Sequence, residues 1–287
     1  KALVALNSPT FDAYQPLLED AALTQLFHRS GQLFLYRNRQ DMDKDTLTHE
    51  LRSEGGASIE FLNAEEIREI EPAITPIFES GYLMPENGHC KDPFGLANGL
   101  VKMFVNKGGV LVKADVLDFI FDADGVSGLS TSSVVLNTRR VVIAAGIWSK
   151  TLCERLGLPV PLESHRGYHA TIENSNISLR HMCFPVDYKF AITPMSMGLR
   201  IAGAVEFAGL GDPPNYERVN KMVKSCHTIL NGSIANTTRS GWVIGPACQI
   251  AYQSLENLGN IPIYSLRSGM DIKGLSAPHK LVKLLPK

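Results

Sequence analysis

The stretch that decides the fold is VVIAAGIWSKTLCERLGLPVPLESHRGYHATIE, residues 141–173. Its β-branched start, residues 141–143, favours a buried strand, and the small residues Ala144, Ala145 and Gly146 follow directly. A short helix then leads to a segment built around residues 166–169. A buried strand that runs into a tight turn with few Cβ atoms brings backbone N–H groups close to a phosphate-bearing cofactor. The stretch therefore predicts an α/β sheet with a cofactor beside this turn.

Composition and charge narrow the class of protein. The 287 residues are 44% hydrophobic and 20% charged, which is enough for one large domain or two intertwined ones with a packed core. The net charge of −1 and the lack of a long basic run argue against a nucleic-acid-binding protein, which needs clustered Lys and Arg. The five cysteines are scattered without a CxxC pair, which indicates a reducing, cytoplasm-like compartment.

The segments around this stretch alternate between helix and strand patterns. Residues 32–37 predict a strand, residues 41–54 a polar helix, and Asn63 with Glu66 a capping box at the start of another helix. Asp124–Gly125 predicts a hairpin turn. Residues 163–207 are rich in strand patterns, and a helix follows from about residue 215. After about residue 235 no clear period remains, and a Gly or Pro recurs every few residues.

A family resemblance covers residues 5–230. The residues that carry it are GYLMPENGHCKDPFGLANGL (81–100), ADV (114–116), VVIAAGIWSKTL (141–152) and PVPLESHRGYH (159–169). In this order and spacing the chain resembles the D-amino-acid dehydrogenase branch of the glycine oxidase/D-amino-acid oxidase family of flavoproteins. The resemblance implies a mixed α/β fold, in which a Rossmann-like FAD-binding domain, here incomplete, is interleaved with a substrate domain built on an antiparallel sheet.

The resemblance also predicts how the chain divides between these domains. Residues 1–80 would belong mainly to the substrate domain and residues 81–161 to the FAD-binding domain. Residues 162–235 would return to the substrate domain, and residues 236–287 would form an aberrant tail.

Carried over position by position, the resemblance implies two sets of site residues. The expected cofactor-binding residues are Val116, Ala144, Ala145, Gly146 and Trp148. The expected substrate-binding residues are Arg166, Tyr168, His169, Tyr188 and Phe190. Two of these residues have a structural alternative to ligand contact. Trp148 could equally be a half-buried aromatic residue at the start of a helix, and Arg166 could be a salt-bridged residue of a strand.

The implied reaction is oxidation of a D-amino acid, or a related small amino acid, with FAD as cofactor and a 2-oxo acid and ammonia as products. Hydride would pass from the substrate Cα to flavin, so no strong acid or base is needed and no catalytic side chain is singled out. His165 and His169 have a metal-ligand spacing, but Gly167 between them and the strand context argue against a metal site. The electron acceptor would be oxygen or a quinone. No apolar run reaches transmembrane length, so no membrane-spanning helix is expected. The expected location is the cytoplasm, and peripheral contact with the inner membrane is left open.

Both ends of the sequence depart from the family pattern. No GxGxxG fingerprint is present, so the chain is expected to lack its start. Back-translation of the tail in a shifted frame admits the family motifs in order, which predicts a frameshift near residues 225–241 and places Gly245 where the family has a carboxylate-binding arginine. The chain as written is therefore expected to bind FAD weakly or not at all and to have little activity. The alternative is a noncatalytic α/β binding module or a non-functional fragment, whereas the missing GxGxxG disfavours a nicotinamide enzyme.

Overall fold

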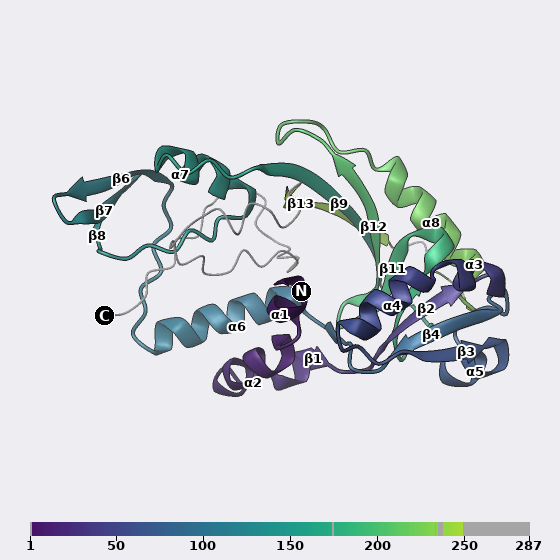
Figure 1. Ribbon diagram of the computed structural model, residues 1–287. Coiled ribbons are helices and arrows are strands. Elements are labelled where there is room, and N and C mark those ends of the chain that lie inside the picture. The colour runs from purple at the N-terminus through teal and green to yellow at the C-terminus, as the bar shows by residue number, and fades with distance from the viewer. Residues whose placement is uncertain (1, 174, 233, 235–237, 249–287) are drawn as a thin grey trace. The chain divides into compact units, whose positions relative to one another are not determined.

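The computed structural model describes residues 2–173, 175–232, 234 and 238–248. The predicted mixed α/β class is confirmed, because helices alternate with strands along the chain and eight of the strands form a large mixed sheet (Figure 1). The chain divides into two compact units. Unit 1 comprises the described residues within 2–92, 167–206 and 211–243, and unit 2 comprises those within 93–166, 207–210 and 244–248. The predicted division into substrate-domain and FAD-binding segments stays a prediction.

Unit 1 is built on an eight-stranded sheet with the order β13-β9-β12-β11-β10-β2-β4-β3. Its strands are β2 (Gln32–Tyr36), β3 (Glu60–Asn63), β4 (Ser80–Met84), β9 (Leu162–Ile172), β10 (Met182–Pro185), β11 (Phe190–Met195), β12 (Gly198–Phe207) and β13 (Thr238–Cys248). The first and last residues of β9 and β13 fall in different units. β10 runs parallel to β2, whereas β11 pairs antiparallel with both β10 and β12. The predicted strand at 32–37 is confirmed as β2, and the start of the predicted aberrant tail is β13, beside β9. Residues 236, 237 and 249–287 of that tail lie outside the described residues.

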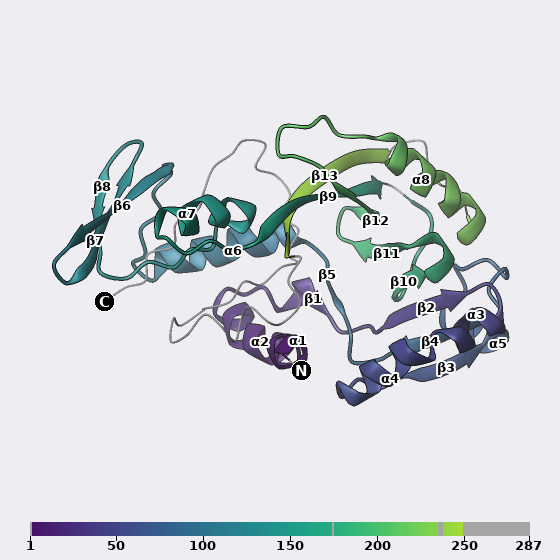
Figure 2. The ribbon, with the colours of Figure 1, turned by 45° about the horizontal axis from the view of Figure 1, so that its top comes forward.

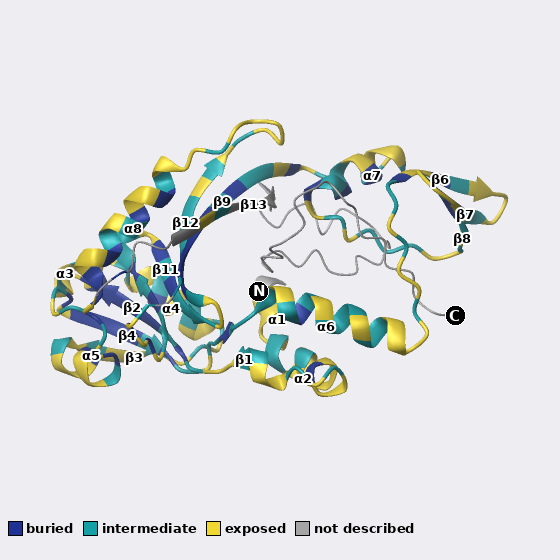
Figure 3. Ribbon diagram, turned by 180° about the vertical axis from the view of Figure 1, so that it is seen from behind, coloured by how far each residue is buried: buried dark blue, intermediate teal, exposed yellow. Residues whose placement is uncertain are grey.

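One face of this sheet forms the main hydrophobic core of unit 1. Alternate strand residues such as Leu33, Ile192 and Ile201 are fully buried and pack against helices α5 (Ala64–Ile70) and α8 (Glu217–Ile229). In α8 the buried residues recur every three or four positions, from Val219 to Ile229, which is the spacing of one helix face. Figure 2 shows α8 lying along the sheet beside β12 and β11, and Figure 3 shows its exposed residues on the side away from the core.

The opposite face of β2 and β4 carries an aromatic cluster under helices α3 (Arg39–Lys44) and α4 (Thr46–Glu54). Phe34 and Tyr82 stack with ring centroids 4.6 Å apart, and the Arg52 guanidinium lies 4.3 Å from the Phe34 centroid. The prediction of one helix over residues 41–54 is wrong, because the helix is interrupted at Asp45. The Asp45 carboxylate accepts a hydrogen bond of 2.7 Å from the Tyr36 hydroxyl, and this tertiary contact accompanies the break.

A capping box begins helix α5. Asn63 accepts hydrogen bonds from Glu65 N and Glu66 N, while the Glu66 carboxylate accepts one from Asn63 N, so the predicted capping box of α5 is confirmed. The N-terminal segment of unit 1 contains α1 (Ala2–Asn7), α2 (Thr10–Asp20), a 3-10 turn (Thr24–Leu26) and β1 (Phe27–His28). β1 pairs antiparallel with β5 (His89–Cys90).

Unit 2 contains the helix α6 (Pro93–Asn106) and a three-stranded antiparallel sheet of β6 (Val116–Asp122), β7 (Gly125–Thr131) and β8 (Val135–Asn137). The predicted hairpin is confirmed, but its turn is one residue earlier than expected: Gly125, with a φ of +114°, already pairs with Asp122, so Ala123 and Asp124 form the turn. The 3-10 turn η2 (Gly146–Trp148) leads into α7 (Ser149–Arg155), and Leu152 of α7 packs with Val116, Phe119 and Leu129.

The buried strand predicted at residues 141–143 is wrong. Of these residues only Val142 has a β-bridge, and all three are only partly buried. Val141 and Ile143 lie against the small core of unit 2, so the segment packs as extended chain. No strand among the described residues of unit 2 pairs with it along its length, and a parallel sheet strand needs such a partner for its backbone groups.

Candidate functional site

The predicted cofactor turn lies in unit 2 and is open on one side. Ala144 and Gly146 are exposed and Ala145 is partly buried. Gly146 has a φ of +55°, in the left-handed region that favours glycine, and an added Cβ there would meet no described atom within 4 Å. The space beside this backbone fits the approach of a flat or phosphate-bearing group. The small residues at 144–146 therefore suit FAD, although contact with FAD stays a prediction.

The other two predicted cofactor residues, Val116 and Trp148, are buried or half-buried by packing within unit 2. The Val116 side chain is 5% exposed in the small core of unit 2. The ladder between β6 and β7 shifts register after Val116, which is a β-bulge at the strand's start. Such a bulge leaves backbone groups available to a ligand even where the side chain is buried. Trp148 is half-buried at the start of α7, which matches the plainer alternative of a helix-start aromatic.

The predicted substrate residues do not gather on one face of the sheet. Tyr168 of β9 and Phe190 of β11 are 1% and 2% exposed, and both belong to the core between the sheet and α8. Tyr188 packs against the same core, with its ring centroid 6.0 Å from that of Phe190. His169 follows Tyr168 in the strand, so its side chain lies on the opposite face. Contact of these residues with a substrate stays a prediction.

Tyr168 links three elements through its hydroxyl. The hydroxyl donates a hydrogen bond to the Glu206 carboxylate at the end of β12 and accepts one of 2.7 Å from Asn215 N. Arg218, in the first turn of α8, places its Nε 3.7 Å from Glu206 Oε1. These contacts connect the start of α8 to the interior of β9 and to the end of β12, so Tyr168 has a structural role inside the core.

His169 and Arg166 are both buried polar residues of β9. Arg166 is 1% exposed and lies in unit 2, and His169 is 3% exposed and lies in unit 1. Gly241 of β13, the neighbouring strand, makes room for the His169 ring: a Cβ there would lie 2.5 Å from His169 Nε2. A residue with a side chain at position 241 would therefore displace this imidazole.

Beside His169, the second face of the sheet carries polar residues that the sequence reasoning missed. Thr171 of β9 is 2% exposed, and its buried hydroxyl has no hydrogen-bond partner among the described residues. Arg200 of β12 is 4% exposed, and it pairs across the ladder with Thr193 of β11. A signal was available in the sequence: in LRI, residues 199–201, an arginine alternates with two apolar residues in a strand pattern. That alternation places Arg200 opposite the core.

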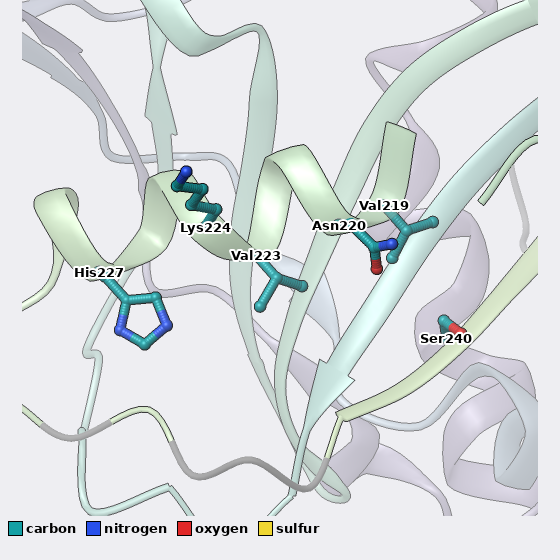
Figure 4. Close-up of a pocket in the computed structure, with 6 residues that line it drawn as sticks. All are labelled: Val219, Asn220, Val223, Lys224, His227 and Ser240. Atoms are coloured by element: carbon teal, nitrogen blue, oxygen red, sulfur yellow. The ribbon is translucent and has the colours of Figure 1, made fainter. Parts of the chain in front are cut away.

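A separate pocket lies between α8 and β13 in unit 1. It is lined by Val219, Asn220, Val223, Lys224, His227 and Ser240 (Figure 4). None of the predicted site residues is among these. Its polar side chains are all exposed, which is typical of a surface groove. Among the described residues no three His, Cys, Asp or Glu side chains gather as a metal site, and no helix is long and apolar enough to cross a membrane.

Comparison with known proteins identifies the family to which the sequence is similar. A family model described as "FAD dependent oxidoreductase" matches residues 1–259. A D-amino-acid oxidase of Bradyrhizobium diazoefficiens is 33% identical over 221 residues, which is 76% of this chain and 52% of the relative. The chain thus spans about half the length of this curated relative.

Solved structures share the fold at lower identity. Glycine oxidase from Bacillus cereus ATCC 14579 superposes with a TM-score of 0.69 and 18% identity, covering 85% of this chain and 68% of that one. Glycine oxidase from Geobacillus kaustophilus also has a TM-score of 0.69, with 20% identity, covering 86% of this chain and 67% of that one. These matches establish the fold.

Proposed function

The chain belongs to the family of FAD-dependent oxidoreductases, and we propose that its protein oxidises D-amino acids. The observation that carries the substrate class is the 33% identity to a relative named as a D-amino-acid oxidase. In the proposed reaction the substrate loses hydride from Cα and a proton from its amine, giving an imino acid. Water then converts the imino acid to a 2-oxo acid and ammonia.

The cofactor of this reaction is FAD, which accepts the hydride when bound. We propose that the backbone of Ala144, Ala145 and Gly146 approaches it, with Val116 and Trp148 nearby. The open space beside Gly146 supports this assignment. These residues would orient the cofactor through backbone groups, since their side chains are small or packed.

On the substrate side we propose a role for His169 and the polar face around it. A buried imidazole held in place by its neighbours orients a small polar molecule at little entropic cost. The steric room that Gly241 leaves for His169 supports this role. The core side of the same strands carries Tyr168, Tyr188 and Phe190, which would hold these strands in position. We also propose that Arg166 contacts the substrate or the cofactor.

The electron acceptor separates an oxidase from a dehydrogenase. We propose the dehydrogenase activity, with a quinone as acceptor and peripheral contact to the inner membrane, on the resemblance of residues 81–169 to that branch. Oxygen is the competing acceptor, and the matched relative named as an oxidase supports it. Hydrogen peroxide formation measured against reduction of a soluble quinone distinguishes the two.

The experiment that tests the function uses the purified chain with FAD in excess, because the sequence predicts weak FAD binding. A panel of D- and L-amino acids is supplied with a quinone, and 2-oxo acid and ammonia are quantified. We expect equal amounts of both products from D-amino acids and none from their L-forms. Failure with every D-amino acid, at FAD concentrations that saturate the protein, would exclude the proposed activity.

A further inference from the structure

The pocket between α8 and β13, which we call the α8–β13 groove, has an apolar floor and a polar rim (Figure 4). Val219 and Val223 are buried and half-buried, and they supply the floor. The rim consists of exposed side chains from both elements: Asn220, Lys224, His227 and Ser240. The groove encloses about 230 Å³, below the ~300–1,000 Å³ of pockets that enclose a small-molecule ligand. Its size therefore suits one or two side chains of a longer ligand.

The strand that borders this groove is the end strand of the large sheet. One edge of β13 pairs with β9, and the other edge has no strand partner among the described residues. Unpaired backbone N–H and C=O groups along such an edge can accept a further strand. Ser240 lines the groove, whereas the next residue, Gly241, lies against His169 on the opposite face. Because side chains alternate along a strand, every second side chain of an added strand would lie on the side of the groove.

The rim of the groove favours a negatively charged ligand. Lys224 carries a positive charge, His227 carries one when protonated, and no Asp or Glu is among the described residues that line the groove. The one acidic residue of α8, Glu217, lies a turn before Asn220 and does not line the groove. Lys224 and His227 are three residues apart on the helix, which separates their Cβ atoms by about 5–6 Å. Side chains on one face of a strand recur every ~6.5–7 Å, so carboxylates two residues apart match this spacing.

We propose that the α8–β13 groove binds an acidic, extended segment of a partner protein, which adds to β13 as a further strand. An apolar side chain of the segment contacts Val219 and Val223, and its neighbouring carboxylates on the same face lie beside Lys224 and His227. Backbone hydrogen bonds to β13 supply affinity, and the groove supplies selectivity. This binding goes beyond the proposed oxidation, because none of the predicted cofactor or substrate residues lines the groove.

A pair of short peptides tests the charge of the ligand against the full chain. The dye-labelled peptide SETVTES places Glu, Val and Glu on one face of a strand, and SKTVTKS places Lys, Val and Lys there. Fluorescence anisotropy is expected to show binding of SETVTES with a Kd below about 300 μM. SKTVTKS should bind at least about 5-fold more weakly, because its charges repel those of the rim. Equal binding of the two peptides, or no binding of SETVTES, overturns the proposal.

N-methylated forms of SETVTES test whether the peptide adds as a strand. The N–H groups of successive residues in a strand point to opposite edges, so only every second one faces β13. One peptide is methylated at its even-numbered residues and another at its odd-numbered residues. We expect one of them to bind at least about 10-fold more weakly and the other within about 2-fold of SETVTES. A loss of binding with both, or with neither, overturns strand addition.

Variants of exposed lysines on α8 locate the binding site. Lys224→Glu reverses the charge of the rim, so it should weaken SETVTES binding by at least about 5-fold and strengthen SKTVTKS binding. Lys221→Glu makes the same change at an exposed residue of α8 that does not line the groove, and it should alter either Kd by less than about 2-fold at physiological salt. Equal effects of the two variants would assign the preference to the net charge of the helix and overturn the groove as the site.

These binding measurements are independent of turnover. Lys224→Glu should oxidise D-amino acids at the same rate as the unchanged chain, since Lys224 is not among the predicted site residues. Peptide binding that follows the expected pattern supports the docking site even if no D-amino acid is oxidised.

Discussion

Replacing Glu71 by alanine is expected to destabilise unit 1 by about 3–5 kcal/mol. Glu71 ends α5, and its side chain is fully buried. Its Oε2 accepts hydrogen bonds from Arg180 N at 2.8 Å and His181 N at 3.0 Å, and it lies 3.2 Å from His181 Nδ1. These two residues lead directly into β10, which joins β2 to β11 in the middle of the sheet.

The magnitude follows from what the substitution leaves behind. Alanine removes the acceptor from two main-chain N–H groups and one imidazole, and each buried group without a partner costs about 1–3 kcal/mol. Relaxation and water entry recover part of this sum, and removing one partner from a buried charged contact costs about 3–5 kcal/mol in practice. Glu71→Gln keeps the shape and one oxygen, so we expect it to lose about 1–3 kcal/mol, as charge-assisted hydrogen bonds become neutral ones.

Urea unfolding followed by circular dichroism measures these differences. Glu69→Ala is the matched control, since Glu69 lies on the same helix with an exposed side chain and should change the free energy of unfolding by less than about 0.5 kcal/mol. The order Glu71→Ala, then Glu71→Gln, then Glu69→Ala is the essential expectation. A Glu71→Ala loss below about 1 kcal/mol would refute the reasoning that this carboxylate holds the entry to β10.

Three further predictions concern other parts of unit 1. Burial lowers the pKa of His89 to about 4, so the unfolded chain binds a proton more readily, and stability should fall by up to about 3 kcal/mol as pH drops from 6.5 through 4; His89→Gln should flatten this pH profile, and an unchanged profile contradicts it. Gly241→Val should displace the His169 ring and abolish D-amino-acid oxidation while FAD content stays constant; full activity would contradict this. Tyr168→Phe should cost about 1–3 kcal/mol in urea unfolding, because Asn215 N loses its acceptor, and a neutral effect would contradict the linking role.

The sequence predicted those parts of the fold that depend on local chemistry. The capping box at Asn63, the strand β2 and the hairpin between β6 and β7 each rest on neighbouring residues and side-chain periodicity, and all three are confirmed. Elements that depend on distant partners were harder to predict. The helix break at Asp45 accompanies a bond from Tyr36, and residues 141–143 have no partner strand among the described residues.

The candidate site shows the same division. The openness of the turn at Gly146 agrees with its small residues. By contrast, Tyr168 and Phe190 were chosen by resemblance, and strand alternation would have placed them with the core residues. The same alternation, applied to β12, would have selected Arg200 for the opposite face. Its neighbours Thr171 and Thr193 could not be found from the sequence, because their proximity depends on the order of three strands.

The most direct test of the central claim is anaerobic reduction of flavin by the substrate. The protein is saturated with FAD, and its absorbance at about 450 nm, where oxidised flavin absorbs, is followed after D-alanine or L-alanine is added. We predict that the flavin absorbance is lost with D-alanine but not with L-alanine. Pyruvate should form in an amount equal to the flavin that is reduced. Flavin that stays oxidised with D-alanine and with every other D-amino acid, while bound to the protein, would contradict the account.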